Sequence, residues 1–290
     1  MTTTTPVYEA RPVRRARSSQ ADLAARRAAL VVIATEHGPC SVRHIYYRAV
    51  VAGLVAKTNA GYAMVQRDLL QLRRDHTIPY TLIVDSSRSA YFPEVWDDLD
   101  GLLDHVAATY RRDLWTRSPY RVEVWAESES ISGTILPTAN AWAVPVYPCR
   151  GQSSETFAWK AAETWKQTPN RTPVVLYIGD HDPAGLEIEE SLLGKLGSFT
   201  ETVFPGIDWT RIGVTWEQVE AFDLPGTKPK KAYGYPYSVE AEALPPRTLI
   251  TLLDRAISNY ADQHDLDVLL AAEESERDIL AQLIYRETTP

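Results

Sequence analysis

Three carboxylates follow predicted strands at positions that suit a divalent cation. The hydrophobic stretch 172–179 ends directly before Asp180 and Asp182, and Glu127 ends the earlier stretch 121–126. Ligands of an open parallel sheet bind at the carboxyl ends of its strands, so we expect these side chains to meet at one edge. Clustered carboxylates repel one another unless a hard cation neutralises them, and Mg²⁺ prefers oxygen ligands. The sequence therefore predicts a Mg²⁺ site with Glu127, Asp180 and Asp182 as metal ligands.

The Asp-x-Asp pair also has a simpler interpretation. Aspartate is favourable at the start of a helix, and Pro183 begins the next helix at a position that proline favours. Asp180 and Asp182 would then form an acidic capping turn. Glu127 favours the metal interpretation, because it lies upstream at the distance that one or two α/β units require. His181 lies between the aspartates, and alternation along the chain points its side chain away from them.

A parallel sheet is needed to position these acids, and the chain after residue 118 has the expected pattern. Strand-like stretches alternate with helical ones, which indicates a parallel sheet covered by helices on both faces. Pro137 is expected to end the first of these helices. The expected strands are 121–126, 144–148, 172–179 and 211–215, and the expected helices are 128–136, 154–167, 183–196, 246–261 and 265–285, with a loop over 222–238.

The N-terminal part has a different organisation. Apolar periodicity, with Gly38-Pro39 as a stop and Ser41 as an N-cap, predicts three helices. They cover 20–36, 41–54 and 61–75, and 78–88 then alternates like a short strand pair. Three helices and a small β wing are typical of a winged helix-turn-helix, whose third helix enters the major groove. We expect a disordered basic tail over 1–18, a DNA-binding domain over 19–92, a connecting amphipathic helix over 93–117 and a sheet domain with C-terminal helices over 118–290.

The charge distribution agrees with a DNA-facing N-terminal part. The net charge is −8, yet residues 1–74 hold twelve Lys and Arg against four Asp and Glu, and residues 232–290 hold four Arg against eleven acids. Such asymmetry suggests a basic end that faces DNA and an acidic end that faces elsewhere, although the tail arginines are equally explained as solvated. The candidate DNA-binding residues are Arg48, Lys57, Arg67, Arg73 and Arg74.

Other features limit the class of protein. Two cysteines make neither a disulfide framework nor a Cys-rich zinc site. No apolar run approaches the roughly 20 residues of a membrane span, and the N-terminus does not resemble a secretory signal. We expect a cytoplasmic protein associated with the nucleoid of a bacterial or phage-infected cell.

Two motifs resemble one known family. GDHDPAG at 179–185, with the upstream Glu127, resembles the Toprim domain in the A subunit of topoisomerase VI and its meiotic double-strand-break relatives. SVRHIYYRAV at 41–50 resembles the active-site string of that family. The resemblance implies a Rossmann-like Toprim domain after the winged helix. Tyr47 would be the catalytic nucleophile that forms a 5′-phosphotyrosyl link, with Arg43 and Glu127 as further catalytic residues.

The physical chemistry of the tyrosine suits this role. A phenol has a pKa near 10, so it needs a nearby cation to ionise as it attacks. Arg43 lies four residues before Tyr47 and therefore on the same helix face. The neighbouring Tyr46 is expected to be a core aromatic. In the family, the tyrosine of one chain pairs with the metal of the other, so the resemblance implies a homodimer on double-stranded DNA.

The chain also departs from the family. Ser128 follows Glu127 where lysine is frequent, which leaves Glu129 as a spare acid. The stretch 151–154 resembles a glycine-containing loop near the metal site, and Glu240 and Glu242 either approach the metal or cap local structure. No Gly-rich phosphate loop is present, so ATP-driven strand passage would need a separate GHKL-type ATPase subunit.

Three functions therefore remain open. The leading hypothesis is a Mg²⁺-dependent DNA transesterase like the A subunit of topoisomerase VI. The second is a Toprim nuclease that hydrolyses DNA with metal-activated water, in which Tyr47 is structural. The third is a non-catalytic DNA-binding protein that uses only the winged helix. The sequence identifies neither the DNA target nor the biological process.

Overall fold

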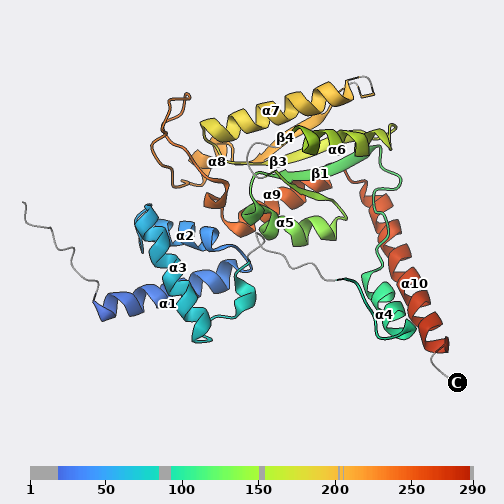
Figure 1. The fold of residues 1–290 in the computed structure, drawn as a ribbon, viewed down its shortest axis with the longest axis horizontal. Coiled ribbons are helices and arrows are strands. Elements are labelled where there is room, and N and C mark those ends of the chain that lie inside the picture. Colours follow the sequence, from blue (N-terminus) through green and yellow to red (C-terminus); the bar gives the residue numbers. More distant parts are fainter. Residues whose placement is uncertain (1–18, 85–92, 150–153, 202, 205, 288–290) are drawn as a thin grey trace, which may run out of the picture.

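The centre of the molecule is a parallel sheet of four strands (Figure 1). A computed structural model of the chain describes residues 19–84, 93–149, 154–201, 203–204 and 206–287, and side chains as far as residue 282. The strand order is β2–β1–β3–β4, and every neighbouring pair is parallel. The strands are β1 (Tyr120–Ala126), β2 (Val146–Pro148), β3 (Thr172–Ile178) and β4 (Asp208–Gly213).

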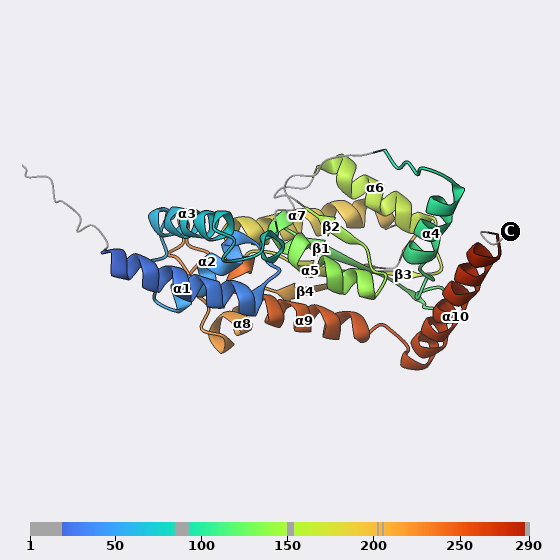
Figure 2. The same cartoon turned by 90° about the horizontal axis from the view of Figure 1, so that it is seen from below.

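Helices cover both faces of this sheet, as the alternating pattern predicts. On one face α5 (Glu129–Ala141) packs on α9 (Pro246–Ser258), and on the other α6 (Glu155–Lys166) packs on α7 (Pro183–Thr200) (Figures 1 and 2). Each face has its own apolar cluster, and both β1 and β3 contribute side chains to each of them. The prediction of an α/β protein with a parallel sheet is confirmed, and the arrangement is compatible with a Rossmann-like domain.

The three predicted N-terminal helices are also confirmed. They are α1 (Gln20–His37), α2 (Val42–Val51) and α3 (Asn59–Arg74). Ser19, Ser41 and Thr58 cap them, each accepting a backbone N–H in the first turn. Their inward faces share one apolar core. Asp68 of α3 is buried and pairs with Arg26 and Arg27 of α1 at 2.7 and 3.2 Å, which joins the first helix to the third.

The strand pair predicted over 78–88 is not present in the part that the structure describes. That part holds a 3-10 turn, Tyr80–Leu82, and a single parallel bridge between Cys40 and Ile83. Hydrogen bonds between Cys40 and the backbone of Leu82 and Val84 hold the segment against the start of α2. Residues 85–92 lie outside the described residues, as does the predicted tail over 1–18.

Two predicted helix bounds were wrong. The connecting helix α4 (Leu99–Thr109) is shorter than 93–117, because Asp98 accepts the N–H of Gly101 and so caps a later start. Pro137 does not end α5, which continues to Ala141. Ile135 and Ala139 on either side of the proline are fully buried, so packing keeps the helix intact against the local preference.

The C-terminal helix extends away from the sheet. After α9, helix α10 (Gln263–Glu287) runs beside α4 and forms a projecting pair with it (Figures 1 and 2). Arg111 and Arg277 both pair with the buried Glu273 at this junction. Among the residues that the structure describes, no helix has the length and apolar character to cross a bilayer.

Candidate active site

The three predicted metal ligands lie at one edge of the sheet. Strands β1 and β3 are paired in register, with Ala126 opposite Ile178. Glu127 follows the first strand and Asp180 follows the second by two residues, so both lie at the carboxyl edge. The backbone N–H of Asp180 donates to Glu127 Oε2 at 2.8 Å. The sequence-based expectation that strand ends bring these acids together is therefore confirmed for Glu127 and Asp180.

Two glycines of the GDHDPAG motif make room for the Glu127 carboxylate. A Cβ at Gly179 would lie 2.8 Å from Glu127 Oε2, and a Cβ at Gly185 would lie 3.2 Å from the same oxygen and 2.4 Å from the carbonyl oxygen of Asp180. Any side chain at Gly179 would collide with the carboxylate. The motif therefore has glycine where the chain packs directly against an acid from another strand.

Each of the three carboxylates is anchored by a backbone amide. Asp180 Oδ1 accepts the N–H of Ala241 at 2.8 Å, and Asp182 Oδ1 accepts the N–H of Gly185 at 2.7 Å as the N-cap of α7. The capping interpretation of Asp182 is thus correct, and Asp180 has a different partner. These bonds fix the carboxylates by one oxygen each, as outer partners commonly fix metal ligands.

Burial and mutual repulsion both act on the acids. Burial raises the pKa of Glu127, and the nearby charges of Asp182 and Glu242 raise it further, against the hydrogen bond from the Asp180 amide. Burial, with the charges of Glu127 and Glu242, raises the pKa of Asp180 to about 8. Asp180 is therefore mostly protonated at neutral pH when no cation is bound, and the charge of Arg211 partly offsets that of Glu127.

Glu242 also lies at this edge, one of the two places that its sequence context allowed. It lies on the short 3-10 turn η2 (Ala241–Ala243) and is 2% exposed. Ser128 Oγ donates to Glu242 Oε1 at 3.1 Å, so the residue that follows Glu127 contacts this acid. Burial raises the pKa of Glu242, although the charge of Arg43 opposes the shift.

Tyr47 lies beside the same C-terminal segment. It is 1% exposed, and it lines a pocket together with Glu240. Burial raises the pKa of Tyr47, the charge of Glu240 adds to the shift, and the charge of Arg43 opposes it. Lys57 Nζ lies 4.9 Å from the centre of the Tyr47 ring, and a pocket of about 140 Å³ is lined by Tyr47, Arg43, Lys57 and Glu240 among others. The expectation that Tyr46 is a core aromatic is confirmed at 6% exposure.

Three basic residues of the N-terminal part hold the segment that carries Glu240. Arg43 Nη1 lies 2.8 Å from Glu240 Oε2, and Lys57 Nζ donates to the carbonyl oxygen of Pro225 at 2.6 Å. The Arg48 guanidinium donates to the carbonyl oxygen of Ala243. Arg48 and Lys57 were predicted as DNA contacts, and the structure instead gives both of them partners inside the chain.

The other predicted DNA-binding residues lie on α3. Arg67 and Arg74 are exposed. Arg73 is half-buried, donates to the carbonyl oxygen of Leu69 at 3.4 Å and lies 5.5 Å from the centre of the Tyr80 ring. Arg67 Nε donates to the carbonyl oxygen of Ala63 at 3.2 Å. Arg67 and Arg74 are nevertheless exposed to solvent, whereas Arg73 is half-buried.

His181 does not face the carboxylates. Its backbone pairs with Val239 in an antiparallel bridge, and its buried ring lies among the rings of Trp216, Tyr233 and Tyr235. The alternation argument is confirmed here. The bridge also explains why the segment that holds Glu240 and Glu242 runs past the DHD turn. Residues 151–153 of the predicted glycine-containing loop lie outside the described residues.

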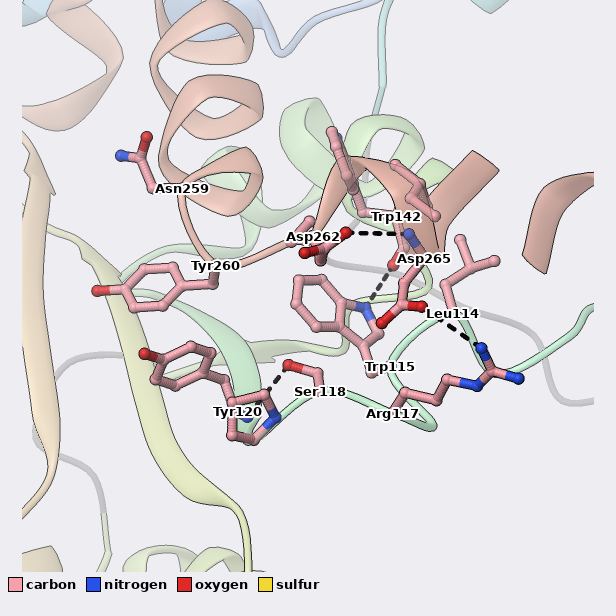
Figure 3. Close-up of a pocket in the computed structure, with 13 residues that line it drawn as sticks. Leu114, Trp115, Arg117, Ser118, Tyr120, Trp142, Asn259, Tyr260, Asp262 and Asp265 are labelled. Atoms are coloured by element: carbon pink, nitrogen blue, oxygen red, sulfur yellow. Dashed lines mark hydrogen bonds and ion pairs between the residues drawn. The ribbon is translucent and has the colours of Figure 1, made fainter. Parts of the chain in front are cut away.

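A separate cavity of about 370 Å³ lies at the other end of the sheet (Figure 3). Trp115, Tyr120 and Tyr260 contribute to its walls, and Asp262 and Asp265 line it from the α9–α10 junction. Tyr120 begins β1, whereas Glu127 follows its end. This cavity is therefore remote from the acidic edge and has no part in its chemistry.

Within the described residues, no group of three His, Cys, Asp or Glu side chains is arranged as a metal-binding set. Mg²⁺ is commonly bound through one or two carboxylates together with waters and substrate phosphates. Glu127 and Asp180 are two carboxylates at one edge of the sheet, and each accepts a hydrogen bond from a backbone amide.

Comparison of the chain with protein-family models, with curated proteins and with solved structures finds no match. What the site does must therefore be argued from its residues and their geometry.

Proposed function

We propose that this chain is a Mg²⁺-dependent DNA-cleaving protein whose sheet domain is of the Toprim type and whose N-terminal helices act as a winged helix. The observation that carries the proposal is the neighbourhood of Tyr47. Tyr47 and Glu240 line the same pocket, and the residue after Glu240, Ala241, donates its N–H to Asp180. A candidate nucleophile and a candidate metal ligand are therefore separated by one short turn.

The proposed reaction is a transesterification. Tyr47 Oη attacks the phosphorus of a DNA phosphodiester, and the bond from phosphorus to the 3′-oxygen breaks. The product is a 5′-phosphotyrosyl link and a free 3′-hydroxyl. Glu240, which lines the same pocket, accepts the phenolic proton, and the departing 3′-oxygen then takes up a proton. Atoms balance without any co-reactant, and the reaction is reversible by the same groups.

The surrounding residues have defined parts in this proposal. Arg43 and Lys57 line the pocket beside Tyr47, so they bind the phosphate that enters it. Glu127, Asp180 and Asp182 would hold Mg²⁺, which would stabilise the charge that develops on the transferring phosphate. DNA would be gripped by exposed arginines of α3. Strand passage driven by ATP would need a separate ATPase subunit.

The test is covalent trapping. The protein is incubated with supercoiled DNA and Mg²⁺ and then denatured, and the DNA is examined for protein attached to 5′ ends. We expect wild type to give protein-linked 5′ ends and Tyr47→Phe to give none, with Tyr110→Phe as the matched control because Tyr110 bonds to Glu276, remote from this site. Absence of protein-linked ends with wild type, alone and with candidate partners, would refute transesterification.

Hydrolysis by a metal-activated water is the second candidate. The burial of Tyr47 favours it, because a phenol that is 1% exposed must be uncovered before it can reach DNA. Under hydrolysis, Tyr47→Phe keeps cleavage and leaves free 5′ ends, whereas Asp180→Asn abolishes cleavage. Under transesterification, both substitutions abolish it.

A further inference from the structure

The cavity of about 370 Å³ lies where the sheet meets the projecting helix α10 (Figure 3). Its lining comes from residues 114–120, which lead into β1, from residues 259–266, which join α9 to α10, and from Trp142 at the end of α5. Ligand pockets occupy about 300–1,000 Å³ and are frequent at junctions between structural units. The cavity therefore has the volume and the position of a small-molecule site.

Four aromatic side chains line this cavity, and three of them use their polar atoms inside the chain. Trp115 Nε1 donates to the carbonyl oxygen of Trp142 at 2.7 Å, and Trp142 Nε1 donates to Asp254 at 2.8 Å. The Tyr260 hydroxyl donates to Asp208 at 2.9 Å. What these side chains offer to a ligand is therefore the apolar surface and the π system of their rings.

The charged residues of the lining have an excess of negative charge. Asp262 and Asp265 contribute two carboxylates, and Arg117 is the one basic residue among the described residues that line the cavity. Arg117 Nη1 lies 3.4 Å from Asp265 Oδ1, and 61% of the arginine side chain is exposed, so this ion pair is weak. Asp262 Oδ1 accepts the N–H of Asp265 at 3.0 Å, which orients its carboxylate at the start of α10. One of the two carboxylates thus has no counter-charge in the lining.

The rings and the carboxylates lie across the cavity from one another. Figure 3 shows Tyr120 and Tyr260 on one side, and Trp115 with the two aspartates on the other. The ring centres of Tyr120 and Tyr260 are 5.2 Å apart, and the rings are nearly perpendicular. Aromatic ring faces attract cations, and a carboxylate forms strong hydrogen bonds with an ammonium or guanidinium group. Both sides of the cavity therefore favour the same kind of ligand.

We propose that this cavity binds a small organic cation, with its ammonium or guanidinium group at Asp262 and its apolar body against Tyr120, Tyr260 and Trp115. The proposal does not depend on DNA cleavage, because the acidic edge lies at the opposite end of β1. A bound cation contacts the sheet and the start of α10 at once. It therefore stabilises the folded chain according to its occupancy.

Titration of the full chain with compounds of different charge tests the ligand class. Phenethylamine, phenethyl alcohol and phenylacetate share an aromatic body and are cationic, neutral and anionic. Choline and putrescine add a quaternary ammonium and a diamine. We expect saturable binding of at least one of the three cations by saturation-transfer NMR, and binding of the alcohol and the acid at least roughly tenfold weaker. Absence of saturable binding of all three cations at millimolar concentration, or equal binding of the neutral compound, would overturn the proposal.

Substitution of the charged residues tests the same point from the side of the protein. Asp262→Asn keeps a good helix cap and removes the charge, so the affinity for the cation should fall roughly tenfold. Arg117→Gln removes the cation that competes for Asp265 and should tighten binding. Asp267→Asn is the matched control, because Asp267 is exposed, bonds to Gln263 and does not line the cavity. A cavity built for an anion would respond in the opposite direction to the first two substitutions.

The contribution of the rings is separated from that of the hydroxyl at Tyr260. Tyr260→Phe keeps the ring and loses the hydrogen bond to Asp208, so we expect it to bind the cation as wild type does. Tyr260→Leu loses the ring and should bind more weakly, and a cooperative urea transition shows that each variant is folded. Equal affinity in the two variants would mean that the ring does not contact the ligand, which would contradict the proposed site. If Tyr260→Leu does not fold, Asp262→Asn and Arg117→Gln decide the question without it.

Discussion

Gly179 and Glu127 are in such close contact that no side chain fits between them. A Cβ at Gly179 would lie 2.8 Å from Glu127 Oε2, and also 2.7 Å from the hydroxyl oxygen of Tyr177. Tyr177 is fully buried, and its hydroxyl has no hydrogen-bond partner within the described part of the chain. Tyr177 has no open space to move into, and Glu127 could move only by leaving the amide of Asp180. The glycine at the end of β3 therefore determines where the Glu127 carboxylate lies.

Gly179→Ala is predicted to disable the acidic edge and to destabilise the fold moderately. The added methyl group forces Glu127 away from the Asp180 amide, and overpacking of this kind costs about 1–3 kcal/mol. We expect Mg²⁺-dependent DNA cleavage to fall to background while a cooperative urea transition remains. The free energy of unfolding and the cleavage rate are measured on the same preparation.

Gly194→Ala is the matched control for this substitution. Gly194 lies within α7, and nothing is found within 4 Å of a Cβ built on it. Alanine in a helix interior is more favourable than glycine by about 1 kcal/mol. We therefore expect Gly194→Ala to raise stability and to leave cleavage unchanged. Equal loss of activity in the two variants would contradict the argument.

The sequence predicted the acidic edge because strand ends obey simple geometry. Hydrophobic runs set β1 and β3, and a parallel sheet brings the residues that follow them to one edge. Glu127 and Asp180 were identifiable on that basis. Glu242 was not identifiable in this way, because it comes from a loop over sixty residues later in the chain. No local sequence pattern predicts that this loop packs against the carboxyl edge of the sheet.

The roles of the basic residues were harder to predict for a related reason. Arg48 and Lys57 have the positive charge that DNA contacts require. Their positions in the sequence do not indicate that they will donate hydrogen bonds to the backbone carbonyls of Ala243 and Pro225. Pro137 shows the same limit for helices, since burial of its neighbours outweighs its intrinsic preference. Local sequence determines helix caps and apolar periodicity, whereas tertiary contacts decide whether a residue such as Pro137 is tolerated inside a helix.

The α3 arginines are predicted to contribute to DNA affinity through counterion release. Arg67 and Arg74 are exposed. Each arginine that neutralises one DNA phosphate adds about 1 to the magnitude of the slope of log K against log salt concentration. We expect Arg67→Gln and Arg74→Gln each to weaken binding to a duplex and to reduce the salt slope by about that amount. Fluorescence anisotropy over a range of salt concentrations gives both quantities.

Arg48→Gln serves as the comparison within the same part of the chain. Its guanidinium already donates to the carbonyl oxygen of Ala243, so its replacement should leave the salt slope unchanged. A slope that changes with Arg48 but not with Arg67 or Arg74 would show that DNA approaches a different face.

The buried ion pair network of the N-terminal helices is predicted to support their packing. Asp68 is 4% exposed and pairs with both Arg26 and Arg27. Asp68→Asn leaves two guanidinium groups without their counter-charge, and removal of one partner of a buried pair costs about 3 kcal/mol. Asp75→Asn is the control, since exposed Asp75 bonds only to Gln71 on the helix surface, and should change stability by less than about 0.5 kcal/mol. Urea unfolding measures both.

Acid is predicted to destabilise the fold through His44. Its ring is fully buried, and burial, with the charge of Arg48, lowers its pKa from 6.5 to about 3. The unfolded chain therefore binds a proton that the folded chain does not bind between these two pH values. Stability is complete above pH about 6.5 and declines as the pH falls toward 3. Between pH 6.5 and pH 5 the loss amounts to roughly 2 kcal/mol.

The pH dependence can be assigned to His44 by substitution. His44→Gln removes the titrating ring, so the change in unfolding free energy between pH 7 and pH 5 should differ from that of wild type by roughly 2 kcal/mol, whatever its effect on stability at pH 7. His37, whose pKa burial also lowers, has a slope of the same sign, and Asp180, whose raised pKa leaves a proton bound in the folded chain, has a slope of the opposite sign. His264→Gln replaces an exposed ring on α10 and keeps His44, so it should retain the full acid sensitivity. An unchanged pH dependence in His44→Gln would mean that the acid sensitivity arises at another group, because no proton would then be taken up at this site on unfolding.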